Sequence, residues 1–154
     1  MSELFAEFLE YAPDTGRFTW KKRASSKADV GTRAGRIQSL GYRQIKLKGR
    51  AVYAHRLAWF FVYGAWPEEE IDHINRNRDD NRIENLRACS RSQNLQNKGG
   101  VVGCYFDGRR GRWVAEICGE KGKIYLGSFS SKDSASLAYR DAKLVHHDFQ
   151  AAYP

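Results

Sequence analysis

The sequence predicts an α+β protein built from two small modules. Stretches that alternate apolar and polar residues are interspersed with stretches of helical periodicity, so strands and helices are both expected. The composition changes at Asn97-Lys98-Gly99-Gly100, a segment typical of a linker. A chain of 154 residues is long enough for one compact domain or two small ones. We therefore place the module boundaries at residues 1–97 and 98–154.

The first module is expected to start with a helix and continue with short strands. Apolar residues at helical spacing predict a helix over residues 3–11. Alternating patterns predict strands over residues 17–20, 42–47 and 51–54, with a polar loop over residues 21–35. The most apolar stretch, HRLAWFFVY at residues 55–63, predicts a buried helix.

The second module is expected to hold three strands and one helix. The strands are predicted at residues 104–106, 112–117 and 123–126, where glycine-containing turns separate them. An amphipathic helix is predicted over residues 131–146, because five apolar or aromatic residues recur there at helical spacing: Ala135, Ala138, Tyr139, Ala142 and Val145.

The charge of the chain favours a nucleic-acid partner. There are 26 Lys and Arg against 18 Asp and Glu, a net charge of +8, and both modules are basic. Basic side chains neutralise phosphates and release counterions. A basic protein with an ordinary solvated surface remains the alternative on charge alone. The chain has no run of about 18 apolar residues, so no membrane span is expected. Its three cysteines are widely spaced, which favours free thiols in the cytoplasm.

The segment from Glu68 to Asn97 contains the residues best suited to phosphodiester hydrolysis. A hydrolytic nuclease needs a hard cation, oxygen ligands for it, and a base that takes a proton from water. Asp72 can supply a carboxylate, His73 a base and Asn94 a second oxygen. Neighbouring strand residues point to opposite faces, so Asp72 and His73 reach one phosphate only at a bend or strand end.

The residue pattern excludes two other kinds of metal site. A calcium loop of the EF-hand type that started at Asp72 would meet Ile74 at a ligand position and lacks the required glycine. A zinc knuckle is excluded because the chain has no Cys-x-x-Cys pair and its four histidines are scattered.

The motifs of this region are His55-Arg56-Leu57, Asp72-His73-Ile74-Asn75, Asn81-Arg82-Ile83-Glu84-Asn85-Leu86-Arg87 and Gln93-Asn94. In these motifs the chain resembles the HNH nuclease family, in its homing-endonuclease branch without zinc cysteines. The resemblance implies a ββα-metal core, double-stranded DNA as substrate, and a homing or phage-type endonuclease. It also implies that His73 is the general base, that Asp72 and Asn94 hold one Mg²⁺ or Mn²⁺ ion, and that Asn85 braces the loop.

Residues 99–150 resemble a second family, the Apetala or ethylene-response-factor DNA-binding domain. The matching residues are Gly100-Val101, Arg112 to Ile117, Tyr125 to Phe129 and the alanine stripe with Tyr139. This resemblance implies a three-stranded antiparallel sheet on one helix, with the outer face of the sheet in the major groove. Cys118 and Val102-Gly103 depart from the family pattern and leave base readout open.

Eight residues are candidates for contact with DNA because basic and aromatic side chains suit phosphates and grooves. They are Arg76, Arg78, Arg109, Arg110, Arg112, Trp113, Lys123 and Tyr125. The alternative for each is an ordinary surface role, and for His55 a structural role is favoured over a place in the site.

Two other function classes remain to be compared with a nuclease. A non-catalytic DNA-binding protein on a nuclease scaffold is disfavoured because all three HNH positions are filled. An RNA-binding module is disfavoured because neither segment has the aromatic signature of common RNA-binding sheets. The target sequence, nicking as against double-strand cleavage, and the oligomeric state stay open.

Overall fold

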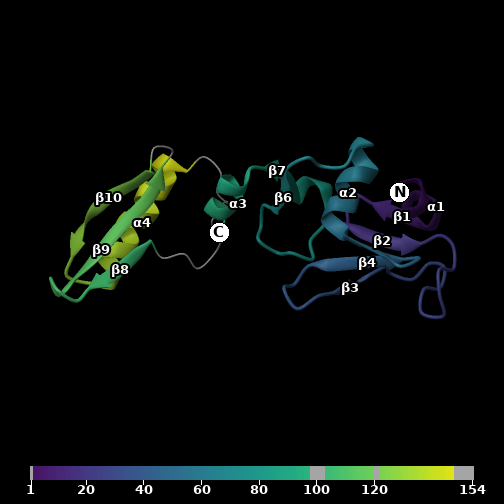
Figure 1. Cartoon of the computed structure of the whole chain (residues 1–154), viewed down its shortest axis with the longest axis horizontal. Helices are drawn as coiled ribbons and strands as arrows, with labels where there is room; N and C mark the ends of the chain where they lie inside the picture. The colour runs from purple at the N-terminus through teal and green to yellow at the C-terminus, as the bar shows by residue number, and fades with distance from the viewer. Residues whose placement is uncertain (1, 98–102, 120–121, 148–154) are drawn as a thin grey trace. The chain divides into compact units, whose positions relative to one another are not determined.

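The computed structural model describes residues 2–97, 103–119 and 122–147 (Figure 1). The chain divides into two compact units, one within residues 1–97 and one within residues 98–150, and each is described by itself. Both units mix helices with small antiparallel sheets, which is consistent with the predicted α+β class. No helix among the described residues is long and apolar enough to cross a membrane.

The described residues of the first unit form three helices, one 3-10 turn and three small sheets. In chain order the elements are α1 (Ser2–Phe8), β1 (Leu9–Ala12), β2 (Arg17–Trp20), β3 (Arg36–Ile37), β4 (Arg43–Leu47), β5 (Arg50–Tyr53), α2 (Ala54–Tyr63), β6 (Glu70–His73), η1 (Ile83–Asn85), β7 (Leu86–Cys89) and α3 (Arg91–Asn97). The antiparallel sheets are β1–β2, β3–β4–β5 and β6–β7.

The predicted first helix is shorter than its apolar pattern suggested. It ends at Phe8, and residues 9–12 form β1, which pairs with β2 across the turn at residues 13–16. Leu9 is almost fully buried in this strand. Its apolar side chain is therefore as compatible with a buried strand position as with the predicted helix. The turn and the hairpin partner therefore decide between the two.

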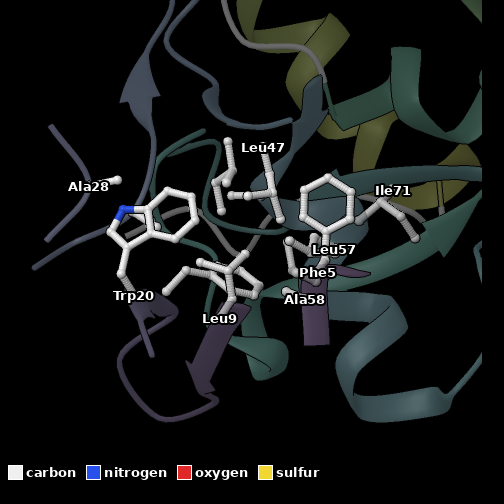
Figure 2. Packing of buried hydrophobic residues seen from close by; sticks show 13 residues of the cluster. Phe5, Leu9, Trp20, Ala28, Leu47, Leu57, Ala58 and Ile71 are labelled. Atoms are coloured by element: carbon white, nitrogen blue, oxygen red, sulfur yellow. The ribbon is translucent and has the colours of Figure 1, made fainter. Parts of the chain in front are cut away.

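One hydrophobic core joins the N-terminal hairpins to the β6–β7 hairpin (Figure 2). Strand β4 buries every second residue, Arg43, Ile45 and Leu47, as expected for a strand with one face on a core. Helix α2 buries Leu57 and Ala58 on one side. Because this cluster also contains Ile71 of β6, residues 2–53 and 54–97 fold as one unit.

A charged cluster fastens the loop after β6 to the same unit. The Asp79 carboxylate accepts hydrogen bonds from Arg43, from Nε at 2.6 Å and from Nη2 at 3.0 Å. It also accepts one from Arg33 Nη2 at 3.2 Å. Arg43 is only 8% exposed, so this ion pair explains why a charged residue occupies a core-facing position of β4.

The second unit is a three-stranded antiparallel sheet against one helix. Its elements are β8 (Cys104–Asp107), β9 (Arg112–Gly119), β10 (Gly122–Phe129) and α4 (Lys132–His146), with the strands in the order β10–β9–β8. Ser131 caps the helix, since its side chain accepts a hydrogen bond from the Ser134 amide at 3.1 Å. Gly103 has φ +55° and lies directly against the Tyr139 ring, where a Cβ has no room.

Candidate functional site

The candidate site starts at the end of strand β6, with Asp72 followed by His73. Strand β6 pairs with β7 so that Asp72 lies opposite Arg87 and His73 lies opposite Leu86. Because successive strand residues point to opposite faces, the carboxylate and the imidazole have different neighbours. Both are buried, with exposed fractions of 7% for Asp72 and 3% for His73.

The Asp72 carboxylate is bound from two sides. Asn97 Nδ2 donates to Oδ1 at 2.9 Å and to Oδ2 at 2.8 Å, and it also lies 2.9 Å from the main-chain oxygen of His73. Arg87 donates to Oδ2 through Nε at 3.0 Å and Nη2 at 2.9 Å. The carboxylate is therefore both ion-paired and hydrogen-bonded.

Helix α3 brings Asn97 to Asp72 and leaves Asn94 at a different carboxylate. Asn94 Nδ2 donates to Glu70 Oε2 at 2.6 Å. Glu70 and Asp72 are two residues apart on β6 and share a face, and α3 contacts this strand. Asn94 and Asn97 are one helical turn apart, so each amide meets one of the two acids. In this structure Asn94 therefore contacts Glu70 and not Asp72, and the shared metal ion of Asp72 and Asn94 stays a prediction.

The His73 imidazole lies on the other side of β6, beside the rings of Tyr42 and His55. Its Nε2 is 3.4 Å from Asn81 Oδ1, and its ring centroid is 5.9 Å from Tyr42. Burial lowers the pKa of His73 below its ordinary value, against opposing effects of the Asn81 hydrogen bond and the charges of Asp72 and Asp80. His73 is therefore uncharged at neutral pH, as a proton acceptor must be.

His55 packs directly against the His73 ring. Its ring meets the His73 ring edge to face at 5.2 Å and stacks on Tyr53 at 5.6 Å. Burial, followed by the charges of His73 and Arg56, lowers the pKa of His55 to about 3. The structure thus brings the His55 ring against the candidate base, and the structural role expected for His55 stays a prediction.

Asn85 joins the two ends of the loop that follows β6. Its Oδ1 accepts from the Asn75 amide at 2.9 Å, and its Nδ2 donates to the Asp80 main-chain oxygen at 2.8 Å. Its own main-chain oxygen accepts from the Ile74 amide at 2.9 Å. Asn85 is buried, so these bonds satisfy its polar atoms and fix the loop.

The two arginines of this loop that were predicted to contact DNA, Arg76 and Arg78, bind groups of the protein itself. Arg76 has φ +64° and donates from Nε to the main-chain oxygen of Asn97 at 2.9 Å and to its Oδ1 at 3.3 Å. Arg78 donates to the Leu40 main-chain oxygen at 2.7 Å, and its guanidinium lies 4.8 Å above the Tyr42 ring. Of the two, only Arg78 is exposed, so it is the better placed to contact DNA.

The oxygens around Asp72 fit one hard cation by their chemistry. Two carboxylate oxygens and the His73 main-chain oxygen lie within 2.9 Å of the same atom, Asn97 Nδ2. Mg²⁺ and Mn²⁺ prefer such oxygen ligands and keep several waters. Among the described residues no three His, Cys, Asp or Glu side chains form a metal-binding group. Asp72 would therefore act with neutral oxygens and water.

The register of the second unit divides its candidate residues between two faces. Arg112, Glu116, Lys123 and Tyr125 share the outer face, because Lys123 pairs with Cys118 and Tyr125 pairs with Glu116 across β9 and β10. The outer face is not uniformly basic, since Lys123 Nζ lies 3.5 Å from a carboxylate oxygen of Glu116.

Trp113 lies on the opposite face, next to helix α4. Its ring is 5.5 Å from Phe106, and Lys132 Nζ of α4 lies 5.7 Å from the ring centroid. Trp113 is thus separated from the outer-face residues with which the sequence grouped it, because sheet register was open at that stage. Arg109 and Arg110 are exposed in the turn after β8.

Three site neighbours were absent from the sequence-based candidates: Asn81, Arg87 and Asn97. Asn97 is the one that a sequence signal identifies, because it follows Asn94 by one helical turn. Asn81 and Arg87 stand at the two ends of the motif from Asn81 to Arg87, and loop and strand pairing brings them to the site.

Comparison with known proteins matches the part of the chain that holds this site. No curated protein and no solved structure matches the chain significantly. Residues 52–96 match a protein family described as HNH endonuclease, and this segment contains Asp72, His73 and Asn85. The match supports an HNH nuclease with DNA as its substrate.

Proposed function

We propose that this protein is a DNA endonuclease that hydrolyses phosphodiester bonds with one divalent cation, Mg²⁺ or Mn²⁺. One observation carries the proposal. Within the segment that matches HNH endonucleases, the last two residues of β6 present a buried carboxylate to an amide of α3 and a buried, uncharged imidazole to the other side. The β6–β7 hairpin with α3 would then be the ββα-metal core.

One group of site residues would bind the cation, and His73 would accept the proton. Asp72 would hold the cation together with an amide of α3; in this structure Asn97 meets Asp72 through its nitrogen, and Asn94 meets Glu70. When bound, the cation neutralises charge on the phosphate and on the leaving oxygen. His73 takes a proton from the attacking water, since its buried ring is neutral at physiological pH. Asn85 keeps the loop between the two strands closed.

A plasmid assay tests this function directly. Supercoiled DNA incubated with the full chain and MgCl₂ or MnCl₂ should be converted to open circles by nicking or to linear DNA by double-strand cleavage. His73→Ala should lose this conversion and still shift duplex DNA in a gel. Glu7→Gln, which alters an exposed ion pair of α1, serves as the matched control. Equal cutting by His73→Ala would remove the proposed base.

The competing function is a DNA-binding protein that does not cut. The ion pair between Arg87 and Asp72 favours it, because a guanidinium already balances the carboxylate charge that a cation would bind. Under this alternative the parent protein shifts duplex DNA and leaves the plasmid intact with either metal. Cleavage that stops when EDTA is added would exclude it.

We propose further that the enzyme is of the homing or phage type and that the second unit positions its duplex target. The outer face of the sheet offers Arg112, Lys123 and Tyr125, a basic and aromatic set that suits phosphates and groove walls. Arg109 and Arg110 extend this set at the β8–β9 turn. The salt dependence of DNA binding tests this role.

A further inference from the structure

Asn81 is a fully buried amide next to the candidate base. Its exposed fraction is 0%, in a loop of mostly solvent-accessible residues. A buried amide must satisfy both its donor and its acceptor, because each unpaired group costs desolvation free energy. The partners of Asn81 therefore reveal which way the amide points.

The amide orientation follows from a main-chain oxygen. Asn81 Nδ2 lies 3.0 Å from the Asp79 main-chain oxygen, which can only accept a hydrogen bond. The nitrogen must face that oxygen, so Oδ1 faces His73 at 3.4 Å from Nε2. An amide oxygen has no proton to give. The hydrogen bond therefore requires a proton on Nε2 of His73.

We propose that Asn81 is a positioning residue that holds His73 in the Nε2–H tautomer and leaves Nδ1 as the atom that accepts the proton from water. In a neutral imidazole only one ring nitrogen carries a proton, so a proton on Nε2 frees the lone pair of Nδ1. The role of Nδ1 in catalysis rests on the proposed nuclease function. The tautomer of His73 follows from the hydrogen bonds of Asn81 alone.

The N-terminal hairpin keeps Asn81 in place. The Tyr11 hydroxyl of β1 donates to the Asn81 main-chain oxygen at 2.7 Å. Gly16, in the β1–β2 turn, has φ +66° and lies so close to the main chain of Asn81 and Arg82 that a Cβ has no room. Tyr11 and Gly16 lie outside residues 52–96, so the segment that precedes the HNH match completes the site.

The tautomer is measurable without any enzyme activity. Two-bond ¹H–¹⁵N correlation spectra of the ¹⁵N-labelled full chain at pH 7.5 separate protonated from unprotonated ring nitrogens, and His73→Gln assigns the signals. We expect one neutral tautomer of His73, protonated at Nε2. In Asn81→Leu, which has similar volume and no acceptor, we expect loss of that single form. Glu7→Gln changes an exposed ion pair of α1 and should leave the His73 signals unchanged.

Activity gives the second readout. Asn81→Leu should lower the plasmid nicking rate at saturating DNA by roughly 10- to 100-fold, the scale of losing a partner that orients a functional histidine. Its affinity for duplex DNA should stay unchanged, and Asn81→Asp, which keeps an oxygen acceptor, should recover part of the rate. A parent His73 protonated at Nδ1, or an Asn81→Leu spectrum identical to that of the parent, overturns the inference. A parent with the expected tautomer and no nicking overturns the nuclease function instead.

Discussion

Asn97 donates one amide nitrogen to both carboxylate oxygens of Asp72, at 2.9 and 2.8 Å. The bond joins the last residue of α3 to the penultimate residue of β6, so it fixes where the helix lies along the hairpin. One turn earlier, Asn94 makes the equivalent bond to Glu70 at 2.6 Å. The two pairs are chemically alike, but Asp72 is buried and Glu70 is exposed. Burial makes the Asn97 bond the more consequential of the two.

Substitution of the two amides should therefore have unequal effects. Asn97→Ala removes the amide beside the buried carboxylate, and we expect Mg²⁺-dependent nicking to fall by roughly 10- to 100-fold. Asn94→Ala removes an exposed bond and should cost about 1 kcal/mol or less in the free energy of unfolding, with little change in nicking. Nicking rates at several MgCl₂ concentrations make the comparison. A loss of nicking confined to Asn94→Ala would instead support the prediction that Asp72 and Asn94 hold the metal ion.

The stability of the first unit should decline in acid because of His55. Its pKa is about 3 in the folded protein and near 6.5 when unfolded, so the unfolded chain binds a proton that the folded chain refuses. The contribution is fully present above pH 6.5 and is lost as the pH falls below it. At pH 4.5 the free energy of unfolding should have dropped by on the order of 2–3 kcal/mol through this residue.

Urea unfolding at pH 7.5 and pH 4.5 measures this decline. His55→Gln, which has no titratable group, should show a smaller difference between the two pH values than the parent. The exposed His146 of α4 offers a control, since His146→Gln should leave the difference unchanged. Equal pH dependence in His55→Gln and the parent would contradict the proposed burial of a neutral His55.

Removing only one partner of the Arg43–Asp79 ion pair should lower the free energy of unfolding substantially. Arg43 and Asp79 are joined at 2.6 Å, and the Arg43 side chain is 9% exposed. Burial opposes ionisation, but the hydrogen bond and charge of Arg43, together with Arg33, hold the pKa of Asp79 below its ordinary value. Asp79→Ala leaves a buried guanidinium unpaired and should cost about 3 kcal/mol of folding stability.

A double-mutant cycle separates this pair from general loop effects. Arg43→Met combined with Asp79→Ala removes both charges and should recover part of the stability lost in Asp79→Ala. Glu7→Gln breaks an ion pair whose partners are about half exposed, and it should cost about 0–1 kcal/mol. Additive losses from Arg43→Met and Asp79→Ala would mean that the two residues are not coupled.

Periodicity along the sequence predicts most of the strands and helices, because alternation and helical spacing are local. The helix α2 and the strands β2, β4 and β9 lie within a few residues of the predicted ranges. The pair Asp72-His73 could also be identified from the sequence, because its two residues are adjacent in the chain. Periodicity misses β3 and β7, and it misses β1, whose four residues form a strand by pairing with β2.

The site contacts that the sequence did not predict depend on residues that are far apart in the chain. Asn94 and Asn97 share one helical pattern, and only the position of α3 along β6 decides which of them meets Asp72. The acceptor for His73 comes from a loop held by Tyr11, 70 residues earlier in the chain than Asn81. The face occupied by Trp113 depends on strand register, which a single strand does not encode.

The outer face of the second unit should determine how DNA binding depends on salt. Arg112 and Lys123 lie on this face, and Lys132 lies on the helix side next to Trp113. Each phosphate contact that is lost should reduce the slope of log affinity against log salt by roughly one. We therefore expect Arg112→Gln and Lys123→Gln to weaken duplex binding in the full chain and to flatten the slope. Lys132→Gln makes the same change of charge on the opposite side and should leave the slope as it is. If Lys132→Gln flattens the slope and Arg112→Gln does not, DNA lies on the helix side of this unit and the outer face has another use.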